Sequence, residues 1–234
     1  MGSDMNENDR QKIVIKLSGS IFNFNTQSAV LKEYAGLFMS LNEKVQLIII
    51  TGGGKIARHY IELARALHSD EATLDILGID ISRINARLLL TAIGRMGYPQ
   101  IPKSLDEVSM SLEFNKIVVV GGLHPGQSTN ATSALISEKI GANIFINATD
   151  VPGIYDKDPA VNSDAKMFTE LSVGKCMELL GQKNSQAGTY ELMDLVALKV
   201  IQRSRIRTIV TNSDISSIKD IILNGSNFGT RITF

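Results

Sequence analysis

The sequence predicts an α/β fold with three layers, in which a central, mostly parallel β-sheet lies between two layers of α-helices. Two observations predict it. Short β-branched runs alternate with amphipathic segments along almost the whole chain, an alternation typical of parallel strands joined by right-handed helical crossovers. Several of these runs are almost continuously apolar, as expected for strands that are buried on both faces of a sheet.

Three strands are expected in the first half of the chain, and glycines follow each of them. They span residues 12–17, before Ser18-Gly19-Ser20, residues 45–50, before Gly52-Gly53-Gly54, and residues 116–120, before Gly121-Gly122. Apolar residues spaced by three or four predict the helices around them. These helices span residues 28–42, 55–68, 71–96 and 129–140. One apolar stripe on the second helix consists of Ile56, Tyr60, Leu63 and Leu67.

The second half repeats the pattern around a loop at residues 150–164 that is rich in proline, glycine and aspartate. Strands are expected at residues 143–148, 208–211 and 230–234, and helices at 173–180, 191–204 and 214–224. We expect a single domain over residues 12–234 with two lobes, 12–140 and 141–234, and two independent domains are the alternative. Residues 1–11 are polar and charged, and are expected to be a flexible N-terminus or the remnant of a tag.

The composition excludes several classes of protein. Of the 234 residues, 44% are hydrophobic and 21% are charged, and 24 basic residues balance 24 acidic ones. This is ordinary globular composition rather than that of a disordered chain. A net charge of zero argues against bulk attraction to nucleic acid or an anionic membrane, and the apolar runs are far shorter than the roughly 20 residues of a membrane helix. Neither nucleic acid nor a membrane is therefore an expected partner.

Cys176 is the only cysteine, so no internal disulfide can form. It lies in an amphipathic stretch without a histidine nearby in sequence, which predicts a buried structural thiol rather than a catalytic one. A chain without disulfides fits a reducing compartment, and a cytoplasmic location is expected.

Four strand ends carry glycine or hydroxyl clusters, namely Ser18-Gly19-Ser20, Gly52-Gly53-Gly54, Gly121-Gly122 with residues 126–129, and Thr149-Asp150. Glycine lets backbone N–H groups approach phosphate oxygens, and a helix N-terminus that follows adds partial positive charge. One such cluster is most often only a tight turn. Four in series favour a site for phosphate groups. Neither the P-loop nor the dinucleotide glycine fingerprint is present, and no cluster has metal-ligand spacing.

Three of these stretches resemble the phosphate loops of the amino acid kinase superfamily, and they are Lys16–Ser20 (KLSGS), Thr51–Arg58 (TGGGKIAR) and residues 148–159 (ATDVPGIYDKDP). Other stretches are similar to archaeal uridylate (UMP) kinases in particular. These are residues 74–79 (LDILGI) with 82–86 (SRINA), residues 121–129 (GGLHPGQST) and residues 187–194 (AGTYELMD). The motifs occur in colinear order from residue 12 to residue 234, which is more specific than any one of them.

The resemblance implies an amino acid kinase-like fold and transfer of the γ-phosphoryl group of ATP to UMP in pyrimidine nucleotide biosynthesis. It implies Mg²⁺ delivered with ATP, UTP as a feedback inhibitor and assembly as a homohexamer. The lobe at residues 12–140 would bind mainly the nucleoside monophosphate, and the lobe at residues 141–234 mainly ATP. The alternatives are a superfamily kinase for carbamate, acetylglutamate or isopentenyl phosphate, and a phosphate- or nucleotide-binding protein without turnover.

Three residues are expected to be catalytic. Lys16 interrupts a β-branched run, where an unpaired charge is costly to bury, and the resemblance implies that it stabilises charge on the transferring phosphoryl group. Asp150 is implied to orient the catalytic lysines, although relatives usually carry Asn or Lys there and Asp where this chain has Pro152. Lys199 aligns with a second lysine, against the alternative of a solvated helix residue, and Asp194 aligns with a possible orienting residue for lysine or Mg²⁺.

The binding residues are also implied by the resemblance. The ATP-binding set is Gly19, Ser20, Gly54, Arg58, Thr149, Asp150, Tyr155 and Asp158. The UMP-binding set is Gly53, Asp75, Leu123, His124, Pro125, Gly126, Gln127, Ser128 and Thr129. Ordinary structural roles compete with several of these: a serine or threonine before a helix is commonly an N-cap, and a first-turn aspartate is favoured by the helix dipole. A second departure from the archaeal pattern is Asn130, where relatives often have Asp.

Overall fold

The computed structural model describes residues 10–182 and 192–234, and in them one continuous sheet forms the centre of the fold. Its strand order is β3-β2-β1-β4-β6-β7-β5. The strands are β1 (Lys12–Leu17), β2 (Gln46–Thr51), β3 (Val118–Val120), β4 (Ile144–Thr149), β5 (Glu170–Ser172), β6 (Thr208–Asn212) and β7 (Thr230–Thr233). All neighbouring pairs are parallel except β6 with β7. The expected mostly parallel α/β architecture is confirmed.

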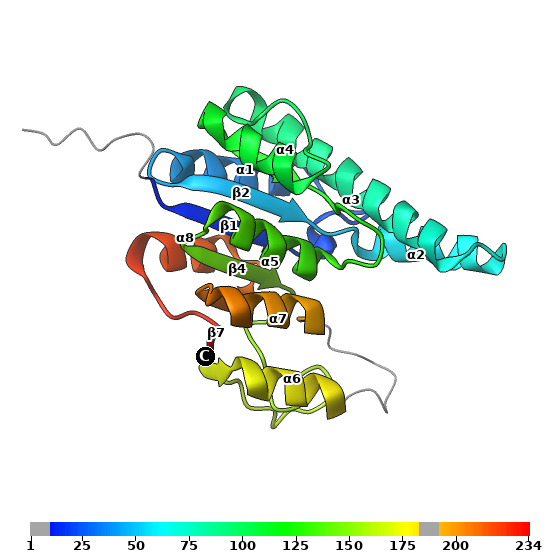
Figure 1. Cartoon of the computed structure of the whole chain (residues 1–234), viewed down its shortest axis with the longest axis vertical. Helices are drawn as coiled ribbons and strands as arrows, with labels where there is room; N and C mark the ends of the chain where they lie inside the picture. Colours follow the sequence, from blue (N-terminus) through cyan, green and yellow to red (C-terminus); the bar gives the residue numbers. More distant parts are fainter. Residues whose placement is uncertain (1–9, 183–191) are drawn as a thin grey trace, which may run out of the picture.

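Helices cover both faces of this sheet (Figure 1). They are α1 (Ser28–Asn42), α2 (Gly54–Ala66), α3 (Glu71–Ile93), α4 (Leu105–Ser111), α5 (Thr129–Ile140), α6 (Val173–Gln182), α7 (Leu195–Ser204) and α8 (Ile215–Asn224). One apolar core joins the sheet to α1, α3 and α8, and the other joins it to α4, α5, α6 and α7. The hairpin of α2 and α3 extends beyond the sheet at the right of Figure 1.

Strand β1 shows how sequence alternation divides these two cores. Ile13, Ile15 and Leu17 belong to the core with α1 and α3, whereas Val14 belongs to the core with α5 and α7. Because successive side chains in a strand point to opposite faces, Lys16 follows Val14 to the second face. Lys16 therefore lies on the face of the sheet that α5 and α7 cover, near the carboxyl end of β1.

Two short elements are absent from the sequence-based prediction. Strand β5 has three residues and lacks a β-branched run, and it forms because β7 offers it a parallel partner. Helix α4 has seven residues and is capped by Ser104, whose hydroxyl accepts a hydrogen bond from the backbone N–H of Glu107. Both elements depend on tertiary contacts or a single cap, so periodicity over a long window misses them.

Two predicted helices have shorter bounds. Helix α3 ends at Ile93 because Gly94 adopts a positive φ of 65° and breaks the α-helical ladder. Helix α7 begins at Leu195, since the Asp194 carboxylate accepts the N–H of Ala197 at 2.8 Å and caps it. Residue 191, where this helix was expected to start, lies outside the described residues.

The N-terminal boundary also differs from the expected one, because residues 10 and 11 are bonded into the fold. Arg10 donates a hydrogen bond of 2.9 Å to the carbonyl of Asn42, and the Gln11 carbonyl accepts the N–H of Gln46 at 2.8 Å. Residues 1–9 lie outside the described part of the chain.

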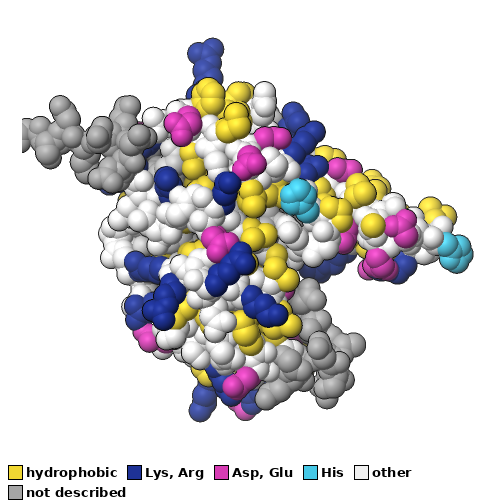
Figure 2. Space-filling view, viewed as in Figure 1, with side chains coloured by type: hydrophobic (Ala, Val, Ile, Leu, Met, Phe, Trp, Pro, Cys, Tyr) yellow, Lys and Arg dark blue, Asp and Glu magenta, His cyan; other side chains and the backbone are white. Residues whose placement is uncertain are grey.

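The apolar stripe predicted on α2 does not reach either core. Tyr60 is 48%, Leu63 51% and Leu67 80% exposed, and Ala57 is the only buried residue of this helix. Hydrophobic side chains are visible along the extended hairpin in Figure 2. The amphipathic character of α2 is real, but within a single chain its apolar side faces solvent.

Cys176 is buried, and burial raises the pKa of its thiol to about 12. A thiol with so high a pKa is almost entirely protonated at neutral pH and is a poor nucleophile. The prediction of a structural thiol is confirmed. Within the described parts of the chain, none of the helices combines the length and hydrophobicity required to cross a membrane.

Candidate active site at the carboxyl edge of the sheet

The expected phosphate loops follow the carboxyl ends of adjacent parallel strands. Strand β1 lies between β2 and β4, so the loops after Leu17, Thr51 and Thr149 leave the same edge. The chain turns from β1 to β2 on one side and later returns to β4 on the other side. Open α/β sheets bind ligands at such a switch point, because diverging loops leave a crevice there.

Lys16 and Asp150 meet at this switch point. Lys16 pairs in register with Ile50 of β2 and Asn147 of β4. Burial lowers the pKa of the Lys16 ammonium from 10.5 to about 8, and the negative charge of Asp150 opposes that shift. The Asp150 carboxylate also accepts a hydrogen bond from the Ser20 hydroxyl. A partly desolvated lysine is thus held beside one carboxylate, where an anionic ligand would stabilise its charged form.

Glycine is required where the first and second loops meet. A Cβ atom on Gly19 would lie 2.2 Å from the backbone nitrogen of Gly54, and a Cβ on Gly54 would lie 2.2 Å from the carbonyl oxygen of Gly19. Gly54 also has a φ of 64° and begins α2. The two backbones touch, so the N-terminus of α2 is held directly beside the turn that follows β1.

A cavity of about 230 Å³ opens next to these loops, between α2, α3 and the loop that leads into α5. Of the sequence-predicted site residues it brings together Gly53, Gly54, Arg58, Asp75, Gln127 and Thr129. It therefore contains a guanidinium group, a carboxylate, a side-chain amide and a hydroxyl. The side-chain oxygen of Gln127 has no hydrogen-bond partner among the described residues. This combination can bind an anionic group at one end and a polar, hydrogen-bonding group at the other.

Three residues of α3 support the walls of this cavity and were not assigned a role from sequence. The Asn85 amide donates to the carbonyl of Gly52 at 2.8 Å, and the Ser82 hydroxyl accepts the N–H of Gly122 at 2.7 Å. The Arg83 guanidinium donates to the carbonyls of Gly122 and Leu123. The sequence signal was their common place in residues 82–86, but hydrogen bonds to backbone groups 31 or more residues away cannot be read from it.

Asp75 also holds this loop, in addition to lining the cavity. Its carboxylate accepts the backbone N–H of Gly126 at 2.6 Å, although the two residues are 51 positions apart. Both positions are exposed. Asp75 is thus already engaged with the loop that contains most of the predicted UMP-binding residues, and one of its carboxylate oxygens remains outside that bond.

A side-chain hydrogen bond between Ser128 and Asp194 joins the first half of the chain to the second. Ser128 caps α5 by accepting the N–H of Ala131 at 3.0 Å, and its hydroxyl donates to the Asp194 carboxylate. Asp194 in turn caps α7. Both residues therefore have the structural capping role that competed with ligand binding, and together they join two helix N-termini.

The end of β4 and the loop after it contain Thr149, Tyr155 and Asp158 of the predicted ATP-binding set. Tyr155 lines a small apolar pocket of about 30 Å³ together with Ile154, Cys176 and Leu179, among others. The Thr149 hydroxyl is engaged with the carbonyls of Val151 and Thr211, and the Asp158 carboxylate accepts the N–H of Ala160. Thr149 and Asp158 thus shape the loop, while Tyr155 faces a pocket.

Other predicted site residues do not line these pockets. Leu123 is buried, and His124 and Pro125 are exposed. Lys199 is exposed on α7 and has no described contact with Lys16 or with the glycine loops. Residues 187–191 of the predicted motif lie outside the described residues.

Fold and site together define a class of protein: a three-layer α/β protein with a phosphate-type site, built from glycine loops and a lysine at a switch point of the sheet. The family model described as "Amino acid kinase family" matches residues 11–212. A uridylate kinase of Methanobrevibacter smithii is 38% identical over 94% of this chain and 98% of its own length. One from Sulfurisphaera tokodaii is 41% identical over the same shares.

Solved structures agree with this grouping. The crystal structure of a uridylate kinase from Archaeoglobus fulgidus has a TM-score of 0.85 at 34% identity, and covers 95% of this chain and all of its own. A UMP kinase from Ureaplasma parvum, at 21% identity and a TM-score of 0.79, shares the fold. The chain belongs to the amino acid kinase family and, within it, to the uridylate kinases, which confirms the resemblance.

Proposed function

We propose that this protein transfers the γ-phosphoryl group of ATP to the phosphate of UMP, giving UDP and ADP. The observation that carries the proposal is the cavity that holds Arg58 and Asp75 beside the Gly52–Gly54 loop, which follows the strand paired with that of Lys16. The uridylate kinase relatives support the choice of UMP among phosphorylated acceptors. A UMP phosphate oxygen would form the new bond to the γ-phosphorus, and ADP would leave with the electrons of the bond that breaks.

Arg58 is assigned to the acceptor rather than to ATP, because it lines the cavity with Asp75, Gln127 and Thr129. A guanidinium group can hold a phosphate through two parallel hydrogen bonds. Gly53 lines the same cavity and would approach the UMP phosphate with its backbone. The remaining oxygen of Asp75 is suited to accept a ribose hydroxyl, and Gln127 to bond the polar edge of uracil.

Lys16 would neutralise charge on the phosphoryl group during transfer. Both substrates are polyanions, so catalysis depends on positioning and charge neutralisation more than on covalent chemistry. A bound phosphate would raise the lowered pKa of Lys16, and Asp150 would keep its ammonium group oriented. Gly19, Ser20 and Gly54 would approach the ATP phosphates, and Lys199 stays a predicted second lysine.

Mg²⁺ is proposed to arrive with ATP. Within residues 10–182 and 192–234 there is no cluster of three or more His, Cys, Asp or Glu side chains that could hold a metal. The oxygen donors Asp150 and Ser20 fit a hard cation that retains phosphate and water ligands. When bound, the cation would neutralise part of the charge on the phosphates.

In this proposal the lobe at residues 12–140 would bind mainly UMP, and the lobe at residues 141–234 mainly ATP. The residues of the acceptor cavity all lie before residue 130, whereas Tyr155 and its apolar pocket lie after residue 141. Tyr155 would flank adenine, which requires the pocket of about 30 Å³ to widen. Thr149 and Asp158 would contribute to ATP binding indirectly, because their side chains form hydrogen bonds with backbone groups at the end of β4 and in the loop after it.

A homo-oligomer, a hexamer by family resemblance, is also proposed. The apolar residues Tyr60, Leu63 and Leu67 of α2 are exposed in the single chain, as are Ile84 and Leu88 of α3. Contiguous exposed apolar side chains mark interaction surfaces in soluble proteins. The cytoplasmic location and inhibition by UTP stay predictions from the sequence.

The test is ADP release from ATP and Mg²⁺ with a panel of acceptors: UMP, CMP, dTMP, acetylglutamate, carbamate and isopentenyl phosphate. We expect turnover with UMP above all others. Turnover with another acceptor and none with UMP would contradict the proposal. The alternative of a nucleotide-binding protein without turnover is tested with Lys16→Met. If the protein is a kinase, this variant should lower kcat by at least about 10²-fold, the scale for losing one electrostatic stabiliser. The exposed residue Lys219 of α8 provides the control variant Lys219→Met, which should retain activity.

A further inference from the structure

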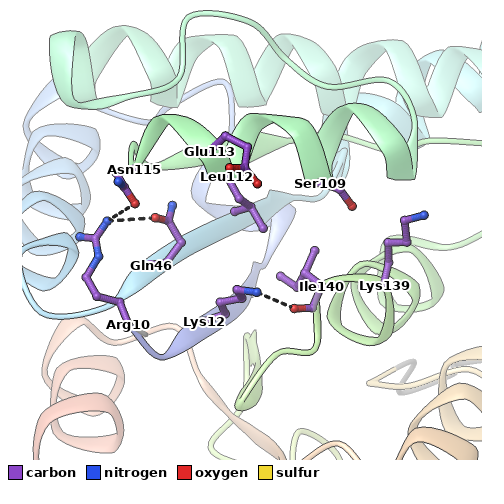
Figure 3. Close-up of a pocket in the computed structure, with 9 residues that line it drawn as sticks. All are labelled: Arg10, Lys12, Gln46, Ser109, Leu112, Glu113, Asn115, Lys139 and Ile140. Carbon is purple, nitrogen blue, oxygen red and sulfur yellow. Dashed lines mark hydrogen bonds between the residues drawn. The ribbon is translucent and has the colours of Figure 1, made fainter. Parts of the chain in front are cut away.

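A second cavity lies at the opposite edge of the sheet from the candidate active site. It has a volume of about 430 Å³ and opens at the amino ends of β1 and β2, beneath α4 and the C-terminus of α5 (Figure 3). Lys12 lines it at the first residue of β1, and Lys16 is four residues further along the same strand. At about 3.3 Å per residue, the two lysines are about 13 Å apart along β1.

Three cationic residues line this cavity, against a single acidic one. Arg10, Lys12 and Lys139 are the cations, and Glu113 is the acid. In Figure 3, Arg10 and Lys139 lie on opposite sides and Lys12 lies between them. The cavity thus concentrates positive charge in a chain whose formal net charge is zero.

Arg10 is fixed in place by neutral groups. Its guanidinium donates to the carbonyl of Asn42 at 2.9 Å, to Oε1 of Gln46 at 3.2 Å and to Oδ1 of Asn115 at 2.8 Å (Figure 3 shows the last two). These acceptors come from the ends of three different elements. Among the described residues, none of the hydrogen-bond partners of Arg10 is a carboxylate, so these partners orient its charge without neutralising it.

The two lysines can also accommodate an anion. The Lys12 ammonium donates to the carbonyl of Ile140 at 3.1 Å, which uses one of its three N–H groups. Lys139 forms an ion pair of 2.8 Å with Asp106, and the two side chains are 43% and 83% exposed. Water and salt screen such a surface pair, so it contributes little to stability. A better-placed anion could therefore take Lys139 from Asp106 at little cost.

We propose that this cavity binds a phosphorylated, hydroxyl-rich small molecule such as a sugar phosphate, at a site separate from the one for ATP and UMP. Its volume falls in the range of small-molecule sites and exceeds what a bare phosphate fills. Arg10, Lys12 and Lys139 supply the charged donors for a phosphate group. Glu113 disfavours a ligand that is anionic throughout, but its carboxylate can accept hydrogen bonds from hydroxyl groups.

The experiment is calorimetric titration of the full chain with glucose 6-phosphate while saturating UMP occupies the candidate active site. We expect binding that persists in UMP, that inorganic phosphate weakens by competition and that glucose alone does not reproduce. The proposal is wrong if neither glucose 6-phosphate nor ribose 5-phosphate binds at concentrations up to about 10 mM. A Kd at this limit corresponds to a binding free energy of about −3 kcal/mol. If UMP abolishes the binding, the ligand occupies the active site and the proposal is also wrong.

Variants locate the site. The double variant Lys12→Gln with Lys139→Gln should weaken glucose 6-phosphate at least about tenfold, because each removes a charge-assisted donor. Glu113→Gln should strengthen it about threefold by removing the only carboxylate of the lining, and this variant guards against a double variant that fails to fold. Lys219→Gln on α8 is the matched control and should leave the affinity unchanged. Equal affinities for all these variants would overturn the proposal.

A competing occupant is the acidic N-terminal segment, whose residues Asp4, Glu7 and Asp9 precede Arg10 in the sequence. A chain that begins at Arg10 distinguishes the two. If the sugar phosphate binds the shortened chain but not the full chain, the segment is the natural occupant and the metabolite proposal fails. Equal binding by both chains supports it.

Discussion

The backbone of Gly19 packs directly on the backbone of Gly54, so closely that a methyl group on either residue would lie 2.2 Å from a backbone atom of the other. This contact joins the turn after β1 to the first residue of α2. It places the two phosphate loops side by side, although 35 residues separate them. The proposed transfer between two bound phosphates depends on this contact.

Gly54→Ala should therefore disrupt the site and lower the free energy of unfolding. The methyl group would meet the Gly19 carbonyl, and the φ of 64° costs a residue with a side chain about 1–2 kcal/mol. We expect kcat/KM for UMP to fall at least about tenfold. The control is Gly36→Ala in α1, where a Cβ meets nothing within 4 Å. This change should stabilise the protein by about 0.5–1 kcal/mol and leave activity intact. Equal losses in both variants, measured by denaturation and turnover, would contradict the packing argument.

The lowered pKa of Lys16 predicts a basic limb in the pH profile. In the free protein its ammonium loses a proton near pH 8, so kcat/KM should fall above about pH 8. Because bound phosphates raise this pKa, the fall in kcat should occur at higher pH. In the variant Lys16→Arg the side chain stays charged at every accessible pH. Its kcat/KM should therefore show no fall above about pH 8, even if its overall activity is lower.

The same shift has a consequence for stability. Between pH 8 and 10.5 the unfolded chain binds a proton at Lys16 that the folded chain has released, so this group makes the free energy of unfolding rise with pH over that range. Lys16→Met should remove this contribution, as denaturation at several pH values would show. An unchanged slope would place the lysine in a more solvated environment than the structure describes.

Removal of the Asp75 carboxylate should affect the acceptor and not ATP. Asp75→Ala releases the N–H of Gly126 and removes the acceptor proposed for the ribose. We expect KM for UMP to rise at least about tenfold, consistent with the loss of one or two charge-assisted hydrogen bonds, while KM for ATP stays within a factor of about two. Asp80→Ala changes an exposed carboxylate of the same helix and should leave both values unchanged.

The hydrogen bond between Ser128 and Asp194 should couple the N-termini of α5 and α7 energetically. Each residue caps a helix, so Ser128→Ala and Asp194→Ala should each cost about 1 kcal/mol of stability. The two side chains also form a hydrogen bond with each other. The loss of unfolding free energy in the double variant should therefore be smaller than the sum of the two single losses, by about 0.5 kcal/mol or more. Strict additivity in a denaturation cycle would show that the contact contributes nothing.

The exposed stripe of α2 gives a test of assembly. Leu63→Glu with Leu67→Glu should shift the protein toward smaller species in light scattering, since charges at a desolvated contact are costly. Val161 is 81% exposed on the loop after β4, and Val161→Glu should leave the mass unchanged. An unchanged mass in the α2 variant would remove this face from the interface.

Local patterns in the sequence determined most of the framework. The β-branched runs located six of the seven described strands, and the glycine clusters after them located the phosphate loops. The apolar repeat located seven of the eight described helices. These elements could be predicted because strand and helix periodicities, and the steric freedom of glycine, depend on only a few neighbouring residues. The short elements α4 and β5 were missed because they depend on a cap or on a partner strand.

The tertiary structure alone decided which distant residues act together. It placed Arg58 in one cavity with Asp75 and Gln127, gave Ser82 and Asn85 their backbone partners, and turned the apolar stripe of α2 toward solvent. It also brought Arg10, Lys12 and Lys139 around one cavity. Such groupings depend on how strands are ordered and how helices cross them. No window of sequence contains that information, because the contacts join residues tens of positions apart.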